Sequence, residues 1–296
     1  MARKIALALF LTAVATATAA HAQLAGVIDI HAHCDPDSTP RSIDAIDLAK
    51  LAKARGMRGL VLKNHYESTA SLAYIVRKEV PGLEIFGGID LNRSVGGLNP
   101  AAIERMVLVK GGWGRVVWFP TYDAENQVKY SKENRPYVSV VRNGKLVPEA
   151  LQVIALAAQH HLTLETGHSS AEEGLMIVRE AHARGVEHIV VTHATLMPVH
   201  MSVAQMREAA SLGAYIEFVY NGVFGRSKEY AMKDYADAIR QVGAKSCILA
   251  SDMGQPGNPL HPDALEAFFK GLLREGIPQA DIDLMSKTNP ARALGL

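Results

Sequence analysis

Two histidines separated by a single residue end an apolar run near the start of the chain. The run at 27–30 leads directly into His31-Ala32-His33. Side chains two residues apart on a β-strand point to the same face, so both imidazoles are expected to face the same way. Two imidazoles on one face at the end of a strand are a ready pair of metal ligands.

Four later apolar runs also end in residues that bind metals or transfer protons. These residues are Lys63 and His65, then His168, His193 and Asp252. A bound cation lowers the pKa of its water to about 7, and a neighbouring carboxylate can pass the water's proton to a leaving group. Asp252 suits this proton transfer. Nitrogen and oxygen donors suit zinc, manganese or iron, and an oxidising compartment without ligating thiolates favours zinc, as one or two ions.

The apolar runs alternate with segments of helical periodicity. Strands are expected at 27–31, 58–62, 84–91, 115–119, 162–166, 188–192, 214–219 and 246–250, and helices at 42–55, 69–80, 100–109, 149–161, 171–184, 203–212, 230–242 and 263–275. Near-continuous apolar strands separated by helices indicate a parallel sheet buried on both faces. Eight such units predict an α/β fold, a (β/α)8 TIM barrel, with a doubly wound open sheet as the alternative.

The long polar segment at 120–148 interrupts this rhythm after the fourth strand. Asn143-Gly144 lies between strand-like residues at 137–141 and 145–147, which is a strong hairpin signal. We therefore expect a β-hairpin insertion in the barrel. In such a barrel the C-terminal ends of all strands meet at one mouth, which would gather the histidines and Asp252 there.

With these residues in place, the chain resembles the amidohydrolase superfamily of metal-dependent hydrolases. The resemblance covers nearly all of the chain after residue 22 and is carried by His31-Ala32-His33, His168, His193, Asp252 and the closing segment 289–296. It implies that His31, His33, His168, His193 and Asp252 are metal ligands and that Asp252 is also the proton shuttle.

One feature departs from the two-metal members of that superfamily. They usually carry a bridging carboxylated lysine or a glutamate at the end of the fourth strand, where this chain has Trp118-Phe119-Pro120-Thr121. The nearest lysine at a strand end is Lys63, on the second strand. Either Lys63 is carboxylated and bridges two metals, or the site holds one metal and Lys63 binds substrate.

Further residues near the expected mouth are candidates for contacting substrate. We assign this role to His65, Tyr122, Tyr220 and Asn221. Glu165 is expected to make a structural hydrogen bond. Glu217 is either a carboxylate behind the ligands or a paired structural charge. An arginine near the mouth, from among Arg93, Arg115 and Arg135, would favour an acidic substrate.

The first 22 residues have the pattern of a cleavable signal peptide. Arg3 and Lys4 precede an apolar stretch at 5–15, and Ala20-His21-Ala22 matches a cleavage site. The stretch is shorter than the ~20 residues that span a membrane. We therefore expect a periplasmic or secreted protein in which residues 23–296 form one barrel domain.

The charge balance points to a small-molecule substrate. The chain has 31 Lys and Arg against 30 Asp and Glu, and residues 1–22 contain two of the basic residues and no acid. Such a balance gives no reason to expect a nucleic-acid or membrane partner. The oligomeric state is left open, a homo-oligomer included.

The two cysteines are expected to be free thiols. Cys34 follows the C-terminal end of the first predicted strand, whereas Cys247 opens the last one. These ends lie on opposite faces of a parallel sheet, roughly 15 Å apart. A disulfide requires Cα atoms within about 7 Å.

Three functions fit these observations. The first is hydrolysis of a C–N or C–O bond in an amide, ester, lactone or cyclic imide by a metal-activated water. The second is decarboxylation, because some proteins of the same superfamily remove carbon dioxide from aromatic acids. The third is a non-catalytic periplasmic metal-binding protein, against which the intact Asp252 argues.

Overall fold

A computed structural model describes residues 23–225 and 228–296, so the expected signal peptide lies outside the described residues. Eight parallel strands form one sheet in the order β1-β2-β3-β4-β7-β8-β9-β10. Their bounds are β1 Ile28–His33, β2 Gly59–Lys63, β3 Glu84–Asp90, β4 Gly114–Trp118, β7 Thr163–Glu165, β8 His188–Val191, β9 Tyr215–Val219 and β10 Cys247–Ala250. The sheet closes through a parallel bridge between Ala32 and Met253. The predicted (β/α)8 barrel is confirmed.

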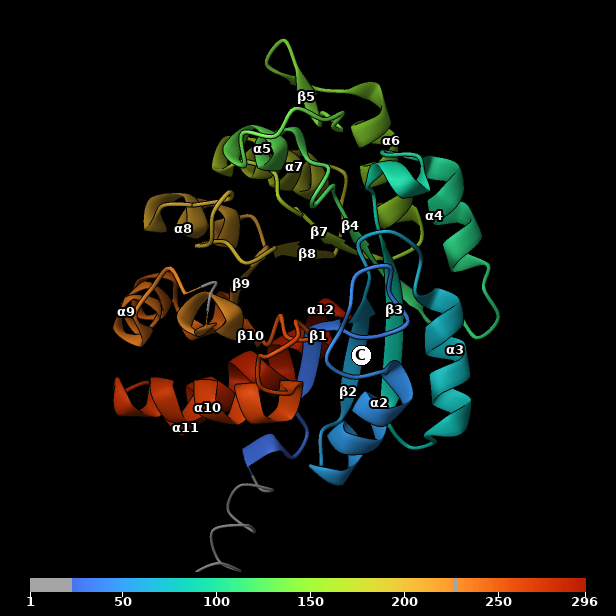
Figure 1. The fold of residues 1–296 in the computed structure, drawn as a ribbon. Coiled ribbons are helices and arrows are strands. Elements are labelled where there is room, and N and C mark those ends of the chain that lie inside the picture. Colours follow the sequence, from blue (N-terminus) through green and yellow to red (C-terminus); the bar gives the residue numbers. More distant parts are fainter. Residues whose placement is uncertain (1–22, 226–227) are drawn as a thin grey trace, which may run out of the picture.

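Helices surround this barrel (Figure 1). They are α2 Ala45–Ala54, α3 Ala70–Glu79, α4 Pro100–Val107, α6 Pro148–Gln159, α7 Ala171–Ala183, α8 Val203–Ser211, α9 Met232–Val242 and α10 His261–Arg274. Local sequence fixes several of their starts. The Asp44 side chain accepts from two backbone N–H groups at the start of α2, and Ser170 and Glu173 form a capping box on α7. The main core lies between the strands and this ring of helices.

The insertion after β4 contains a helix that the sequence analysis did not predict, α5 Glu125–Tyr130. The expected hairpin is present as β5 Val141–Arg142 paired antiparallel with β6 Lys145–Leu146. Asn143 and Gly144 have φ values of 51° and 72°, the left-handed conformation that a type I′ turn requires. The first hairpin strand is shorter than expected, because Val138 instead pairs with Ala124 at the start of α5.

The chain end, for which no element was predicted, is folded as α11 Gln279–Asp283, a π-helical turn at Leu284–Thr288 and α12 Asn289–Ala293. The Thr163 hydroxyl donates to the Ala293 carbonyl at 2.7 Å. Ala293 and Leu294 pack against the apolar side chains inside the barrel. This segment therefore closes the end of the barrel opposite the mouth.

Two further observations bear on sequence predictions. Cys34 and Cys247 are buried and free, as predicted. Among the described residues, no helix combines the length and the apolar character needed to cross a membrane.

Candidate metal centre

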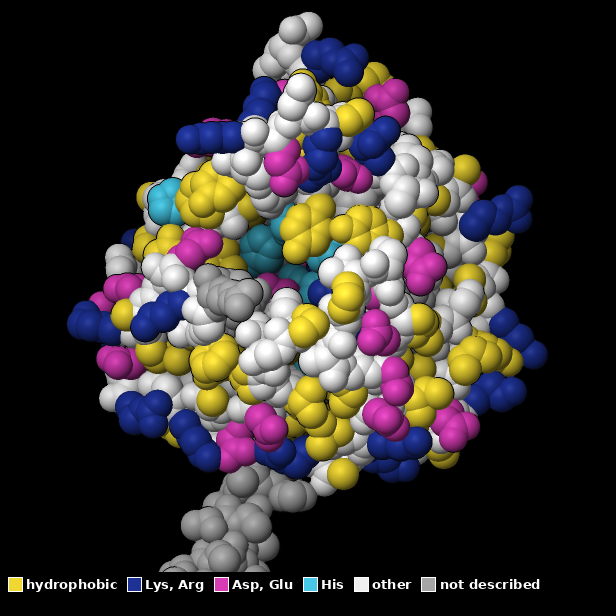
Figure 2. All heavy atoms as spheres, viewed as in Figure 1, with side chains coloured by type: hydrophobic (Ala, Val, Ile, Leu, Met, Phe, Trp, Pro, Cys, Tyr) yellow, Lys and Arg dark blue, Asp and Glu magenta, His cyan; other side chains and the backbone are white. Residues whose placement is uncertain are grey.

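A cavity of about 180 Å³ opens at the C-terminal mouth of the barrel. Histidine side chains are visible at the bottom of this hollow (Figure 2). The lining comes from most of the strand ends and from the loops that follow them. It consists of His31, His33, Arg41, His65, Tyr122, His168, His193, Leu196, Met197, Asn221, Glu229, Asp252 and Gln255. The strands thus bring together all five residues that the superfamily resemblance implied as ligands.

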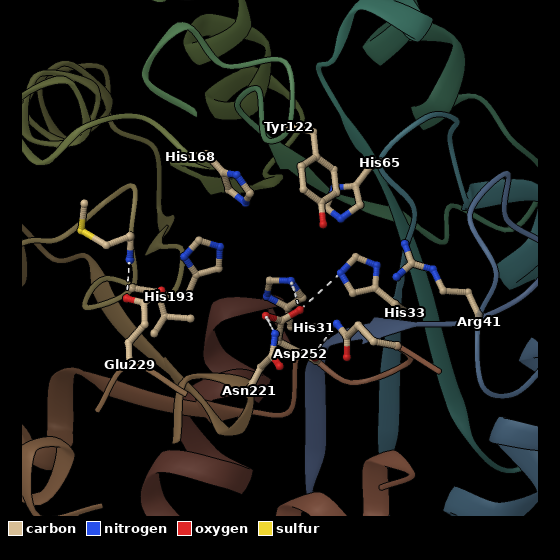
Figure 3. A pocket seen from close by; sticks show the side chains of 13 residues that line it. His31, His33, Arg41, His65, Tyr122, His168, His193, Asn221, Glu229 and Asp252 are labelled. Atoms are coloured by element: carbon tan, nitrogen blue, oxygen red, sulfur yellow. Dashed lines mark hydrogen bonds and ion pairs between the residues drawn. The ribbon is translucent and has the colours of Figure 1, made fainter. Parts of the chain in front are cut away.

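Three of these side chains form a compact set of donors (Figure 3). The Nε2 atoms of His31 and His33 each lie 3.4 Å from Asp252 Oδ1. One ligand atom from each residue lies within 4.8 Å of the other two, and all three residues are buried. Two imidazole nitrogens and a carboxylate oxygen in this arrangement fit a divalent cation such as zinc.

A bulge in β1 turns both histidines into the barrel. The register with β2 shifts between Asp29 and Ala32. The Asp29 carboxylate fixes the bulge, because it accepts from the backbone N–H of His31 at 3.2 Å and of Ser251 at 3.0 Å. Before the bulge, Ile30 packs inside the barrel. After it, His31 and His33 face the cavity while Ala32 packs in the outer core.

Glu217 orients His31 from beneath. Its carboxylate lies 3.1 Å from His31 Nδ1 and accepts from the backbone N–H of His193 at 2.7 Å. Burial lowers the pKa of His31, but the charges of Glu217 and Asp252 outweigh it and raise that pKa to about 9. Positive charge is therefore favoured at this position. An Nδ1–H bonded to a carboxylate leaves Nε2 free to ligate.

His168 and His193 face the cavity from the other side. His168 Nδ1 lies 2.8 Å from the Gln127 side-chain oxygen on α5, so the insertion orients this imidazole. Burial lowers the pKa of His193 to about 4 and that of His168 well below its usual value, which keeps both rings neutral. Their ring centroids are 4.9 Å apart. Neutral imidazoles are the form that binds metal.

Two candidate ligands have unusual backbone geometry. His193 has φ 25° and Asp252 has φ 51°, both in the region that non-glycine residues rarely adopt. The Nδ1 atoms of His33 and His193 are buried and lack a hydrogen-bond partner among the described residues. Backbone strain and orphaned polar atoms at the same place are typical of functional sites.

Lys63 lies below the cavity and does not line it. Its Nζ is 2.9 Å and 3.1 Å from the two carboxylate oxygens of Asp90 on β3, and both side chains are fully buried. Nζ also lies 4.1 Å from the centroid of the Trp118 ring, the residue that ends β4. Although burial raises the pKa of Asp90, the Lys63 charge holds it well below its usual value.

The same Asp90 carboxylate orients His65. His65 Nδ1 lies 3.0 Å from Asp90 Oδ2 and 2.9 Å from Thr121 Oγ1. Thr121 Oγ1 donates to Asp90 at 3.0 Å and accepts from the Asn92 amide at 2.7 Å. The Thr121 hydroxyl donates its hydrogen to Asp90. In the contact between His65 and Thr121, the hydrogen must therefore be on His65 Nδ1. Its Nε2 is then a bare acceptor in the cavity wall.

The remaining substrate candidates divide into two groups. Tyr122 and Asn221 line the cavity; the Tyr122 ring packs 4.3 Å from that of His65, and Asn221 donates to Asp252 Oδ2 at 3.0 Å. Tyr220, expected at the mouth, does not line it. Its ring packs against Phe224 and Phe268, because the 3₁₀ turn after β9 directs it into the core.

Two acidic side chains on the strands match earlier expectations. Glu165 accepts a hydrogen bond from Thr192 at 3.0 Å, the structural contact that was predicted. Of the two alternatives for Glu217, its bonds to His31 and His193 favour a carboxylate behind the ligands.

Two residues of the site were missed. Asp90 is the last residue but one of the third predicted strand, 84–91, and a charged residue near the end of an apolar run was a usable signal. Arg41 lies in the loop after β1 and carried no signal at all. None of the three arginines considered earlier lines the cavity: Arg135 pairs with Asp123 and Glu133, Arg115 donates to the Gly112 carbonyl, and Arg93 lines a separate outer groove.

The fold and site together define a TIM barrel with a cluster of histidines and one aspartate at its mouth that could hold a metal ion. The model described as "Family of unknown function (DUF6282)" matches residues 26–217, and the chain belongs to that family. No match is found among curated proteins.

Solved structures share the fold across almost the whole chain. An amidohydrolase from Pseudomonas aeruginosa is 14% identical, with a TM-score of 0.63 over 94% of this chain and 98% of that one. A mutant organophosphorus hydrolase from Deinococcus radiodurans is 17% identical, with a TM-score of 0.61 over 93% and 94%. The phosphotriesterase homology protein from Escherichia coli, with phosphate in its active site, is 18% identical, with a TM-score of 0.60 over 91% and 98%. At the level of the fold, the amidohydrolase resemblance is confirmed.

Proposed function

We propose that this protein is a metal-dependent hydrolase that cleaves a C–N or C–O bond in a small substrate such as an amide, ester, lactone or cyclic imide. The observation that carries the proposal is the convergence of His31, His33 and Asp252 on one point at the barrel mouth. Hydrolases of amidohydrolase and phosphotriesterase type among the similar structures support it.

His31, His33 and Asp252 would hold the cation, with His168 and His193 available from the opposite side. When bound, a divalent cation supplies a water of lowered pKa and polarises the substrate carbonyl. Two imidazole nitrogens and a carboxylate oxygen suit zinc, manganese or iron, and we propose zinc.

The chain's own groups then handle the proton and the substrate. Asp252 accepts the proton of the attacking water and delivers it to the leaving nitrogen or oxygen. The Asn221 amide, which bonds Asp252 Oδ2, fixes the carboxylate while Oδ1 stays beside the two histidines. His65 Nε2 and the Tyr122 side chain offer hydrogen bonds to the substrate from the adjacent wall.

We assign Lys63 a positioning role and propose a single cation. As an ammonium, Lys63 neutralises Asp90, and Asp90 in turn holds His65. A carboxylated Lys63 would set a second negative charge about 3 Å from the Asp90 carboxylate in a buried site, which is strongly unfavourable. Electron density at high resolution that showed a carbamate on Lys63 between two metal peaks would overturn this assignment.

The test combines metal analysis with a substrate screen. Purified protein should bind about one equivalent of zinc and turn over at least one amide, ester, lactone or cyclic imide. His31→Ala and Asp252→Asn should abolish turnover while circular dichroism stays unchanged. Full activity of both variants would refute the proposal, and release of carbon dioxide as the product would replace it with the decarboxylase alternative.

We also propose export, on the support of the sequence of residues 1–22 alone. Expression of the full chain in a Gram-negative host should yield periplasmic protein whose N-terminus is Gln23. Cytoplasmic protein that retains Met1 would contradict export.

A further inference from the structure

Arg41 is the only lysine or arginine among the described residues that line the cavity. It follows β1 in the chain, and its guanidinium lies beside His33 in the close view (Figure 3). Only 5% of its side chain is exposed. A guanidinium this deeply placed has lost most of its hydration and needs acceptors in return.

The loop that carries Arg41 is tied to the barrel mouth. The Ser42 N–H donates to the Gly254 carbonyl at 2.8 Å, and the Asp35 N–H donates to the Ile43 carbonyl at 2.9 Å. The first bond connects the loop after β1 with the loop after β10, which carries Asp252, and the second joins two parts of the loop after β1. Arg41 is therefore held in a fixed relation to the candidate metal centre.

The protein satisfies only one edge of the guanidinium. Arg41 Nε and Nη2 both contact Asp37 Oδ2 at 2.7 Å, and the Asp37 side chain is completely buried. Nη1 makes no hydrogen bond with any described residue, and it is not among the buried atoms that lack a partner. Its donors therefore face the open space of the cavity, where a planar anion can accept from them.

The charge of the cavity selects the class of ligand. Asp37 already neutralises much of Arg41, and the described residues that line the cavity include no lysine and no second arginine. A phosphate dianion would call for several donors. A carboxylate needs one guanidinium edge and is also attracted by the cation that the proposed function requires.

We infer that the substrate carries a carboxylate next to the scissile bond and that Arg41 binds it. The inference rests on the proposed function and narrows it to acidic substrates, such as N-acyl amino acids or lactones bearing a carboxylate. Glu229 lines the same cavity and bonds the Met197 N–H at 2.9 Å. In the close view it lies across the cavity from Arg41 (Figure 3), so the carboxylate is expected to bind on the Arg41 side only.

The experiment uses paired probes that separate the cation from Arg41. Malonic, succinic and glutaric monohydroxamates are compared with the same molecules in which the carboxylate is replaced by an amide. The hydroxamate ligates zinc in both, so only the second group differs. Calorimetric titration of the zinc-loaded protein should show that at least one acid binds about 10- to 100-fold more tightly than its amide, as expected for a charge-assisted hydrogen bond.

Arg41→Met should abolish this difference, because the affinity for the acid probe falls to that for the amide probe. Because the substitution leaves Asp37 buried without its partner, the double variant Asp37→Asn with Arg41→Met serves as a second test in case the single variant does not fold. Arg142→Met, on the exposed hairpin and outside this cavity, is the matched control and should behave as the wild type.

The outcomes distinguish failure of the carboxylate inference from failure of the proposed metal site. Equal binding of acid and amide by the wild type, or a preference that survives in both Arg41 variants, would overturn the carboxylate inference and leave the hydrolase intact. A larger Arg41-dependent gain for the matching phosphonates would replace carboxylate by phosphate. Failure of every hydroxamate to bind would overturn the proposed metal site and the inference with it.

Discussion

Two histidines of the cavity are each held by a buried carboxylate, but the negative charge of that carboxylate is neutralised differently in the two cases. His31 Nδ1 lies 3.1 Å from Glu217, and His65 Nδ1 lies 3.0 Å from Asp90. Both carboxylates are fully buried. In each pair the carboxylate fixes the ring so that Nε2 is directed to the cavity.

The difference lies in what neutralises the carboxylate. Asp90 has a cation of the protein itself, Lys63, and burial lowers the pKa of His65 so that its ring stays neutral. Among the described residues, Glu217 has no lysine or arginine partner. Its charge must therefore be balanced at His31, by a proton or by a metal ion. This difference supports the proposed role of His31 as a metal ligand and the proposed role of His65 as a neutral contact for substrate.

The largest effect is expected from Lys63→Met. The substitution leaves the Asp90 carboxylate buried without its cation, a change that costs about 3–5 kcal/mol of folding free energy. Urea unfolding of the metal-free protein measures it. The double variant Lys63→Met with Asp90→Asn removes both charges, keeps an oxygen that accepts from His65 and Thr121, and should recover most of the loss. If the Lys63→Met variant were as stable as the wild type, Lys63 would not be what neutralises Asp90.

The next effect separates the two carboxylates by metal affinity. Glu217→Gln should weaken zinc binding about 10- to 100-fold, because the carboxylate no longer orients and polarises His31. Asp90→Asn, the matched change at the other pair, should leave zinc affinity within about threefold of the wild type. Competition titration with a fluorescent zinc chelator gives both values. Equal losses in the two variants would remove the distinction between the pairs.

A third effect, on the pH dependence of stability, concerns Glu165, which is buried near Glu217. Burial and the Glu217 charge raise the pKa of Glu165 from 4.5 to about 8. A carboxyl group with a raised folded-state pKa contributes stability that is complete below its unfolded value and is lost as the pH rises toward 8. The metal-free wild type should therefore lose stability relative to Glu165→Gln between about pH 5 and pH 8. Thermal unfolding of both proteins across this pH range measures the difference between their midpoint temperatures. A difference that stays constant would mean that Glu165 is ionised throughout.

The sequence by itself determined the barrel and the main cluster at its mouth. Strand periodicity and helix signals are local, and eight alternating units can satisfy them by closing one parallel sheet. Once the sheet is closed, side chains at the strand ends converge, which is why His31, His33, His168, His193 and Asp252 reach one cavity.

Tertiary structure alone decided what surrounds that cluster. The partner of Lys63 is set by the neighbouring strand, since Asp90 on β3 lies beside β2 in the sheet. Loops after strands fold under long-range contacts that no local pattern encodes, and these contacts directed Arg41 into the cavity and Tyr220 into the core. The sequence therefore predicted that four histidines and Asp252 gather at the mouth, whereas the side chains that hold and surround this cluster depended on packing between distant segments.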